Sequence, residues 1–196
     1  MLIQKHYDDI RDMMLPGDVL AFSGKGKFSD IIKWATGSVV SHVGIVINNV
    51  IAFNQVVEAA TINGFSGVST NFLYKRILEY DGELWWLPLR QDVRKKLDIG
   101  AMQKFLLAQD GKKYDLPQAI AAGLALIKNE EDFSEMFCSE IVAAALEVGG
   151  IVSLNASEMT PIDVCKLNVY NSEYYQIKGE HLSIGDSAYE TPSSDI

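Results

Sequence analysis

Three side chains in this 196-residue chain have the types that nucleophilic acyl transfer requires, and the first is a cysteine. Cys138 begins an alanine-rich run that extends to Val148, a composition that predicts a helix. At a helix N-terminus, unpaired backbone amides and the helix dipole favour an anion. Such a position can lower a thiol pKa from about 8.5 to ~3.5–7.5, which produces the nucleophilic thiolate. The alternative is a buried structural thiol, because cysteine is among the most buried residue types.

The second is a histidine. His42 opens a predicted strand, 42–47, in an apolar run. A strand end holds a side chain rigidly, and an imidazole with an ordinary pKa of about 6.5 suits a general base. The other two histidines, His6 and His181, lie in polar segments. His42 is therefore the candidate base, and a histidine bonded only to backbone is the alternative.

The third is a carboxylate in an apolar strand. Glu58 stands within Val-Val-Glu-Ala-Ala, and a buried charge without a partner is costly. If a turn at Asn48-Asn49 forms a hairpin, Glu58 lies on the strand next to His42 and can approach its ring. Glu58 would then orient the imidazole and stabilise the imidazolium. An ordinary surface position on an alternating strand is the alternative.

A loop at 23–27 supplies further candidates. Its lysines, Lys25 and Lys27, could border a cleft and meet a substrate carboxylate. Ser41, directly before His42, is a candidate substrate-binding residue. Cys165 follows an apolar turn, which favours a buried structural thiol.

Composition limits the class of protein. The formal net charge of −9 argues against a nucleic-acid partner, which favours a basic surface. Two cysteines cannot form a disulfide scaffold, and no spacing of cysteines and histidines is typical of zinc, so we expect no metal and no cofactor. No signal peptide and no apolar run of about 20 residues is present, which predicts a cytoplasmic protein without an integral membrane segment; export by another route stays open.

The order of elements predicts an α+β fold. Strands concentrate within residues 19–89, with helices on both sides along the chain. We expect an amphipathic helix over 2–14, a loop over 61–71, and helices over 92–108 and 116–128. The length suits one domain, which we place at 1–182, and the polar residues 183–196 are expected to form a flexible tail.

Taken together, these motifs resemble the circularly permuted NlpC-type family of papain-like cysteine hydrolases, in its YiiX-like branch. The resemblance covers about residues 15–166. It is carried by the following segments: Pro16–Phe22, Ser41–Val46, Val57–Ala59, Gly-Lys-Lys-Tyr-Asp at 111–115, Phe-Cys-Ser-Glu-Ile-Val at 137–142, and Thr160-Pro161.

The resemblance implies a permuted papain-like fold with an antiparallel sheet of about five or six strands packed with helices. It also implies residue roles: Cys138 as nucleophile, His42 as base and Glu58 as the residue that orients His42. Tyr114 matches a family tyrosine near the active site and is a candidate oxyanion donor, with the Cys138 backbone amide as a second.

The implied activity is that of a cysteine amidase or peptidase that forms a thioester acyl-enzyme. Its substrate would be a cell-wall (peptidoglycan-type) peptide, a small peptide or a lipopeptide. The same fold includes lecithin retinol acyltransferase-like proteins, so a lipid acyltransferase or thioesterase is the first alternative. A non-enzymatic binding module that retains the fold is the second. The oligomeric state is left open by the sequence.

Overall fold

The computed structural model describes residues 1–48, 54–113 and 137–185. These residues form a mixed α and β structure around one sheet of seven strands in the order β1-β7-β6-β2-β3-β4-β5. The strands are β1 (Leu2–Gln4), β2 (Val19–Gly24), β3 (His42–Ile47), β4 (Gln55–Ile62), β5 (Phe65–Phe72), β6 (Gly82–Leu87) and β7 (Tyr174–Lys178). The predicted α+β class is confirmed.

The predicted strand number and pairing are wrong in part. Seven strands, not five or six, make up the sheet, and the sheet is mixed because β1 and β7 run parallel. The remaining neighbours pair antiparallel. The extra strands lie at the two edges, where β1 and β5 each have a single neighbour.

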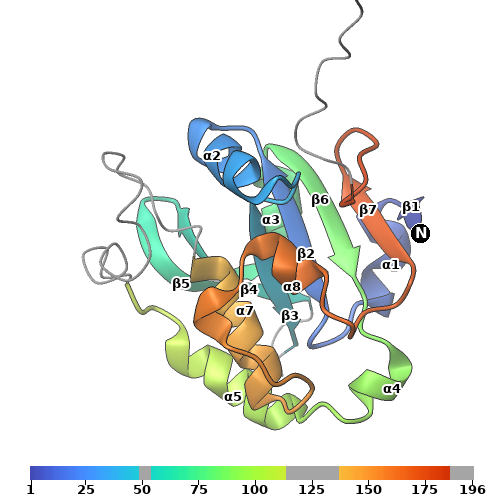
Figure 1. Ribbon diagram of the computed structural model, residues 1–196, viewed down its shortest axis with the longest axis vertical. Helices are drawn as coiled ribbons and strands as arrows, with labels where there is room; N and C mark the ends of the chain where they lie inside the picture. Colours follow the sequence, from blue (N-terminus) through green and yellow to red (C-terminus); the bar gives the residue numbers. More distant parts are fainter. Residues whose placement is uncertain (49–53, 114–136, 186–196) are drawn as a thin grey trace, which may run out of the picture.

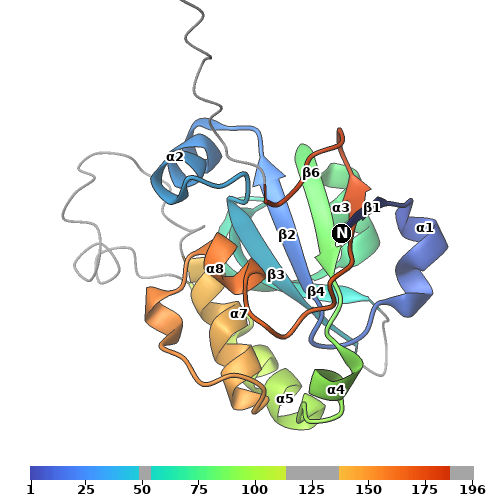
Figure 2. The ribbon, with the colours of Figure 1, turned by 45° about the vertical axis from the view of Figure 1, so that its right-hand side comes forward.

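Helices cover both faces of the sheet (Figures 1 and 2). One face is covered by α5 (Ile99–Gln109), α7 (Phe137–Val148) and α8 (Pro161–Cys165), which share a hydrophobic cluster with the sheet. The opposite face carries α1 (Tyr7–Ile10) and α3 (Leu73–Glu79), which share a second cluster. The α2 helix (Lys27–Thr36) follows the end of β2 and packs against it, and α4 (Gln91–Arg94) precedes α5.

Strand β2 shows how the sequence builds two cores. Its side chains alternate between the faces of the sheet, as the two-residue period of a strand requires. Val19 and Ala21 belong to the cluster under α7, whereas Leu20 and Phe22 belong to the cluster under α3. A strand buried on both faces is a continuous apolar run, which is the pattern of this segment.

The expected helix over 2–14 is wrong for its first residues. Leu2 and Ile3 pair with Tyr174 and Tyr175 in the parallel β1–β7 ladder, and α1 begins only at Tyr7. The partner strand lies more than 170 residues away in the sequence. A local periodicity cannot show such a pairing, because the hydrogen bonds that stabilise the strand come from the far end of the chain.

The expected loop over 61–71 is also wrong. Residues 65–72 form β5, which pairs with β4 from Ile62–Phe65 to Gln55–Phe72. The two strands are joined by Asn63-Gly64, both with positive φ (52° and 79°). Asn-Gly is the preferred pair for such a two-residue hairpin turn, since both positions require left-handed backbone. Serines and threonines on this half-buried edge strand give it the composition of a loop.

Two helical segments replace the single helix expected over 92–108. α4 ends at Arg94, and α5 begins at Ile99 with Asp98 as its N-cap, whose side chain accepts a hydrogen bond from the Ala101 amide. The predicted helix starting at Cys138 is confirmed as α7. Thr160 and Asp163 form a capping box that starts α8, with Pro161 as its first residue.

The predicted helix over 116–128 and most of the predicted tail, 186–196, lie outside the described residues. Among the residues that the structure describes, no helix is long and apolar enough to cross a membrane.

Candidate functional site

The end of the β3–β4 ladder positions the candidate base and its carboxylate. The ladder runs from Ile47–Gln55 to Gly44–Glu58 and stops there, while β4 continues to pair with β5 as far as Ile62. His42 lies two residues beyond Gly44 on β3. Side chains two apart on a strand share a face, so the ring of His42 lies diagonally across from Glu58.

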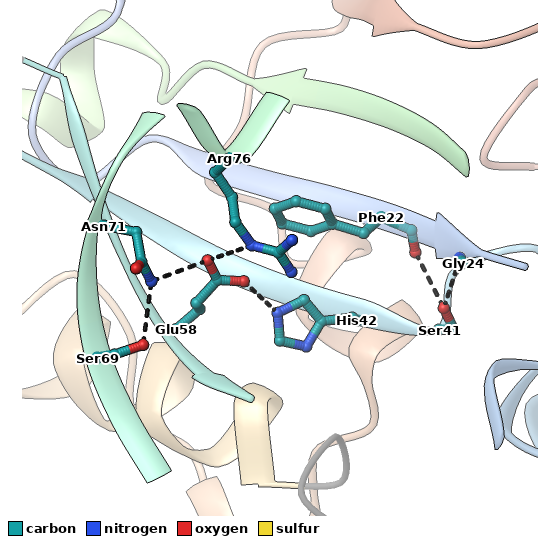
Figure 3. A network of polar contacts seen from close by, with 8 residues as sticks. All are labelled: Phe22, Gly24, Ser41, His42, Glu58, Ser69, Asn71 and Arg76. Carbon is teal, nitrogen blue, oxygen red and sulfur yellow. Dashed lines mark hydrogen bonds and ion pairs between the residues drawn. The ribbon is translucent and has the colours of Figure 1, made fainter. Parts of the chain in front are cut away.

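His42 and Glu58 form a buried hydrogen-bonded pair. Nε2 of His42 lies 2.9 Å from Oε2 of Glu58, and the two side chains are 2% and 0% exposed (Figure 3). The ring also packs against Phe22, its partner across the β2–β3 ladder, with 5.0 Å between ring centroids. The approach of Glu58 to the His42 imidazole, which we expected from their adjacent strands, is therefore present.

The second carboxylate oxygen of Glu58 has its own partners. Oε1 accepts a hydrogen bond from Nε of Arg76 at 2.7 Å and one from Nδ2 of Asn71 at 3.3 Å. Burial by itself raises the pKa of Glu58, but the hydrogen bond from His42 and the charge of Arg76 outweigh it and lower the pKa below its usual value. Glu58 is accordingly an anion at neutral pH.

Cys138 also acts on the His42 ring. Burial alone lowers the pKa of His42, but the charge and side-chain hydrogen bonding of Cys138, together with Glu58, raise it from 6.5 to about 10. Nδ1 of His42 is buried and has no hydrogen-bond partner among the described residues. Both neighbours therefore favour the protonated form of the His42 imidazole.

Cys138 reaches this position from the other face of the sheet. It lies in the first turn of α7, which packs against β3 and β4. Its side chain is fully buried and belongs to the hydrophobic cluster under α7. The neighbouring Ser139 donates a hydrogen bond to the carbonyl of Met159, which ties the helix start to the segment before α8.

The second cysteine differs from the first. Cys165 ends α8, and the two cysteines form no disulfide. Burial and the charge of Cys138 both raise the pKa of Cys165, which disfavours its thiolate. Cys165 is half-buried, not fully buried, and its structural role stays a prediction.

The remaining candidate residues are not brought to the pair. Ser41 is buried, and its Oγ accepts a hydrogen bond from the Gly24 amide at 3.1 Å (Figure 3), so it fixes the backbone that enters β3. Lys25 is exposed and lies 3.6 Å from Asp81 in a surface ion pair. Lys27 is exposed at the start of α2. Tyr114 lies outside the described residues.

Sequence reasoning missed three residues that build the site. Arg76 and Asn71 hold Glu58, but each comes from an element that only the fold brings to β4. Gly44 lies opposite Glu58, and a Cβ there would stand 2.6 Å from Cγ2 of Val56 and 3.4 Å from Cβ of Glu58. The glycine in the Ser-His-Val-Gly segment was the one available signal of such a close approach.

Within the described residues, no group of three or more histidine, cysteine, aspartate or glutamate side chains could hold a metal ion. The chain matches no protein-family model, and no curated protein matches it in sequence.

Proposed function

We propose that the protein is a cysteine hydrolase that cleaves an amide bond through a thioester acyl-enzyme. Cys138 is the nucleophile, His42 the base and Glu58 the residue that orients His42. The single observation that carries the proposal is the buried chain of interactions from Cys138 through His42 to Glu58, which raises the pKa of His42 to about 10.

The acylation step follows from that arrangement. The proton of the Cys138 thiol passes to His42, which leaves a thiolate beside an imidazolium. Sγ attacks the carbonyl carbon of the substrate and forms a tetrahedral oxyanion. When this intermediate collapses, the C–N bond breaks, and His42 gives its proton to the leaving amine. The amine departs, and the acyl group remains on Sγ as a thioester.

In the deacylation step, His42 takes a proton from water and passes a proton to the sulfur. A water molecule attacks the thioester carbonyl while His42 takes one of its protons. The C–S bond then breaks, the acid leaves, and the sulfur regains a proton from His42. Throughout, Glu58 keeps Nε2 of His42 engaged at 2.9 Å, so that the other edge of the ring stays directed at the reacting groups.

Two features assist the developing charges. The start of α7 offers backbone amides to the oxyanion, and the amide of Cys138 is the candidate donor. The carboxylate of Glu58 stabilises the imidazolium through charge, which is worth more in a buried setting than in water.

The substrate class rests on the resemblance of the motifs. We propose a cell-wall peptide, a small peptide or a lipopeptide. The lipid acyltransferase or thioesterase alternative uses the same Cys–His chemistry and differs only in the acyl donor and acceptor. Turnover of acyl esters without turnover of peptides would reverse the order of these two activities.

One observation favours a non-catalytic module. Cys138 is 0% exposed, whereas reactive cysteines are commonly in part accessible. In this second function the fold binds a ligand, and the Cys138–His42–Glu58 chain is a structural ion network. Catalysis, by contrast, requires neighbouring groups to move before a substrate can reach Sγ.

The decisive experiment combines turnover with detection of the acyl-enzyme. The protein is incubated with cell-wall peptides, short peptides, lipopeptides and acyl esters, and intact-mass spectrometry records any acyl adduct. Cys138→Ala should abolish both adduct and turnover, and His42→Ala should suppress turnover. Cys165→Ala is the matched control and should retain both. Turnover that survives Cys138→Ala would contradict the proposal, and binding without any adduct would favour the non-catalytic module.

A further inference from the structure

Arg76 is the one charged partner of Glu58 in the described residues that comes from outside the β3–β4 pair. It lies on α3, and its Nε donates to Oε1 of Glu58 at 2.7 Å (Figure 3). The Arg76 side chain is 15% exposed, and that of Glu58 is 0% exposed. A buried ion pair costs desolvation, so its presence beside the candidate base calls for a reason.

Aromatic side chains fix the guanidinium. Its central carbon lies 5.5 Å from the ring centroid of Phe22 and 4.9 Å from that of Tyr80. These distances are typical of cation–π contacts. The Phe22 ring also contacts His42, with 5.0 Å between centroids. Arg76 and His42 are thus held against the same aromatic ring while they bind opposite oxygens of one carboxylate.

The two oxygens of Glu58 are divided between two sets of partners. Arg76 and Asn71 occupy Oε1, and His42 occupies Oε2. A carboxylate fixed at one oxygen cannot rotate freely, so the direction of Oε2 depends on Arg76. A carboxylate that gained a proton would also lose the charge that supports an imidazolium.

We propose that Arg76 is a positioning residue of the hydrolase: it keeps Glu58 ionised and oriented, and thereby keeps His42 directed at Cys138. This inference rests on the function proposed above. Arg76 touches no reacting atom and acts only through Glu58. The charged or titratable groups that act on Glu58 in the described structure are Arg76 from α3 and His42 from β3, and Cys138 from α7 acts on His42.

The test measures the pH profile of Cys138 alkylation by iodoacetamide in a Cys165→Ala background. Arg76→Met removes the charge and keeps the length of the side chain. A nearby cation lowers a carboxyl pKa by roughly 1–3 units, so loss of Arg76 raises the pKa of Glu58. A protonated Glu58 no longer supports the imidazolium and the thiolate beside it, so the acid limb of the profile should move upward by about one pH unit or more. On that limb the rate at a fixed pH should fall about tenfold. Arg76→Lys keeps the charge and should return the acid limb most of the way to its wild-type position.

A matched control separates positioning from general stability. Arg94 is 14% exposed and pairs with Asp18, which is 0% exposed, so this ion pair is buried to the same degree. Asp18 precedes β2, at the opposite end of that strand from Phe22. Arg94→Met should lower the resistance to urea unfolding and leave the pH profile of alkylation unchanged.

The outcomes are distinguishable. If wild-type Cys138 reacts no faster than Cys138 in His42→Ala, the proposed function fails. If wild-type Cys138 is reactive and Arg76→Met leaves the acid limb unmoved, the function stands and the role of Arg76 is overturned. Equal shifts in Arg76→Met and Arg94→Met also overturn it. Should Arg76→Met not fold, Arg76→Gln, which keeps a donor without the charge, must move the limb.

Discussion

Nε2 of His42 lies 2.9 Å from Oε2 of Glu58, although the two residues are sixteen positions apart and on different strands. Their contact depends on the point at which β3 stops pairing with β4, since His42 extends two residues beyond the last paired position, Gly44. Nε2 of the ring is thereby held on the carboxylate, and the charge of Cys138, in the first turn of α7, raises the pKa of the same ring. This contact supports the proposed role of His42 as the base.

The protonation of His42 is the first prediction. With a pKa of about 10, its ring should remain an imidazolium at pH 8, where an imidazole with the ordinary pKa is neutral. Nitrogen chemical shifts of labelled histidine over a pH titration measure this directly. Because the charge of Cys138 is the largest factor that raises the pKa, Cys138→Ala should lower the midpoint clearly. An unchanged midpoint in that variant would show that the sulfur does not act on the ring.

The second prediction concerns acid stability. The pKa of Glu58 is lowered in the folded protein, so the unfolded chain binds more protons here as the pH falls. The contribution of Glu58 is present above its unfolded value of 4.5 and is lost as the pH falls through the lower folded value. In Glu58→Gln the unfolding free energy should therefore decrease less steeply below about pH 4.5 than it does in wild type. Urea unfolding at several pH values measures this.

The same decrease of unfolding free energy with falling pH in wild type and Glu58→Gln would contradict this linkage. Glu140 supplies the control, because it is partly exposed and burial raises its pKa, the opposite direction. Glu140→Gln should not remove the acid sensitivity that is assigned to Glu58.

Gly44→Ala is the third prediction. The added methyl group would stand 2.6 Å from Cγ2 of Val56 and 3.4 Å from Cβ of Glu58, so Val56 must shift and Glu58 is crowded. Overpacking of this kind costs about 1–3 kcal/mol in unfolding free energy. Turnover should fall further than stability explains, because the carboxylate moves away from His42.

The control for this variant is Gly26→Ala, since a Cβ at Gly26 meets no described atom within 4 Å. If both variants have the same turnover and the same stability, the close approach of Gly44 to Glu58 has no functional weight.

Asp18 gives a prediction about the fold alone. Its buried carboxylate accepts hydrogen bonds from the amides of Leu15 and Leu89 and from Nε1 of Trp86, and it pairs with Arg94. Asp18→Ala removes the partner of a largely buried arginine, which costs about 3–5 kcal/mol. Urea unfolding measures the loss. Asp92→Ala, which removes an exposed partner of Arg90, should have little effect on stability.

The parts of the site that the sequence predicts are those with a strong local pattern. His42 and Glu58 each lie in an apolar run that forms a strand, and the charge inside such a run needs a partner. Cys138 begins a helix with an alanine-rich composition. Each of these inferences uses only neighbours in the chain.

The parts that sequence reasoning missed depend on distant pairing or on competing signals. Arg76 faces Glu58 only because the β4–β5 hairpin places α3 over the sheet. Asn63-Gly64 is a sequence signal for the turn of that hairpin, but the serines and threonines of its second strand have the composition of a loop. The parallel pairing of β1 with β7 joins the two ends of the described chain, and no local pattern predicts it.

The central claim is that His42 activates Cys138, and competitive alkylation tests it most directly. Wild-type protein is exposed to limiting iodoacetamide at pH 6, and mass spectrometry of the peptides gives the labelled fraction of each cysteine. Cys138 should be labelled first and Cys165 slowly, because burial raises the pKa of Cys165 and disfavours its thiolate. His42→Ala should abolish the preference. Equal labelling of the two cysteines, or faster labelling of Cys165, would contradict the claim that Cys138 is an activated nucleophile.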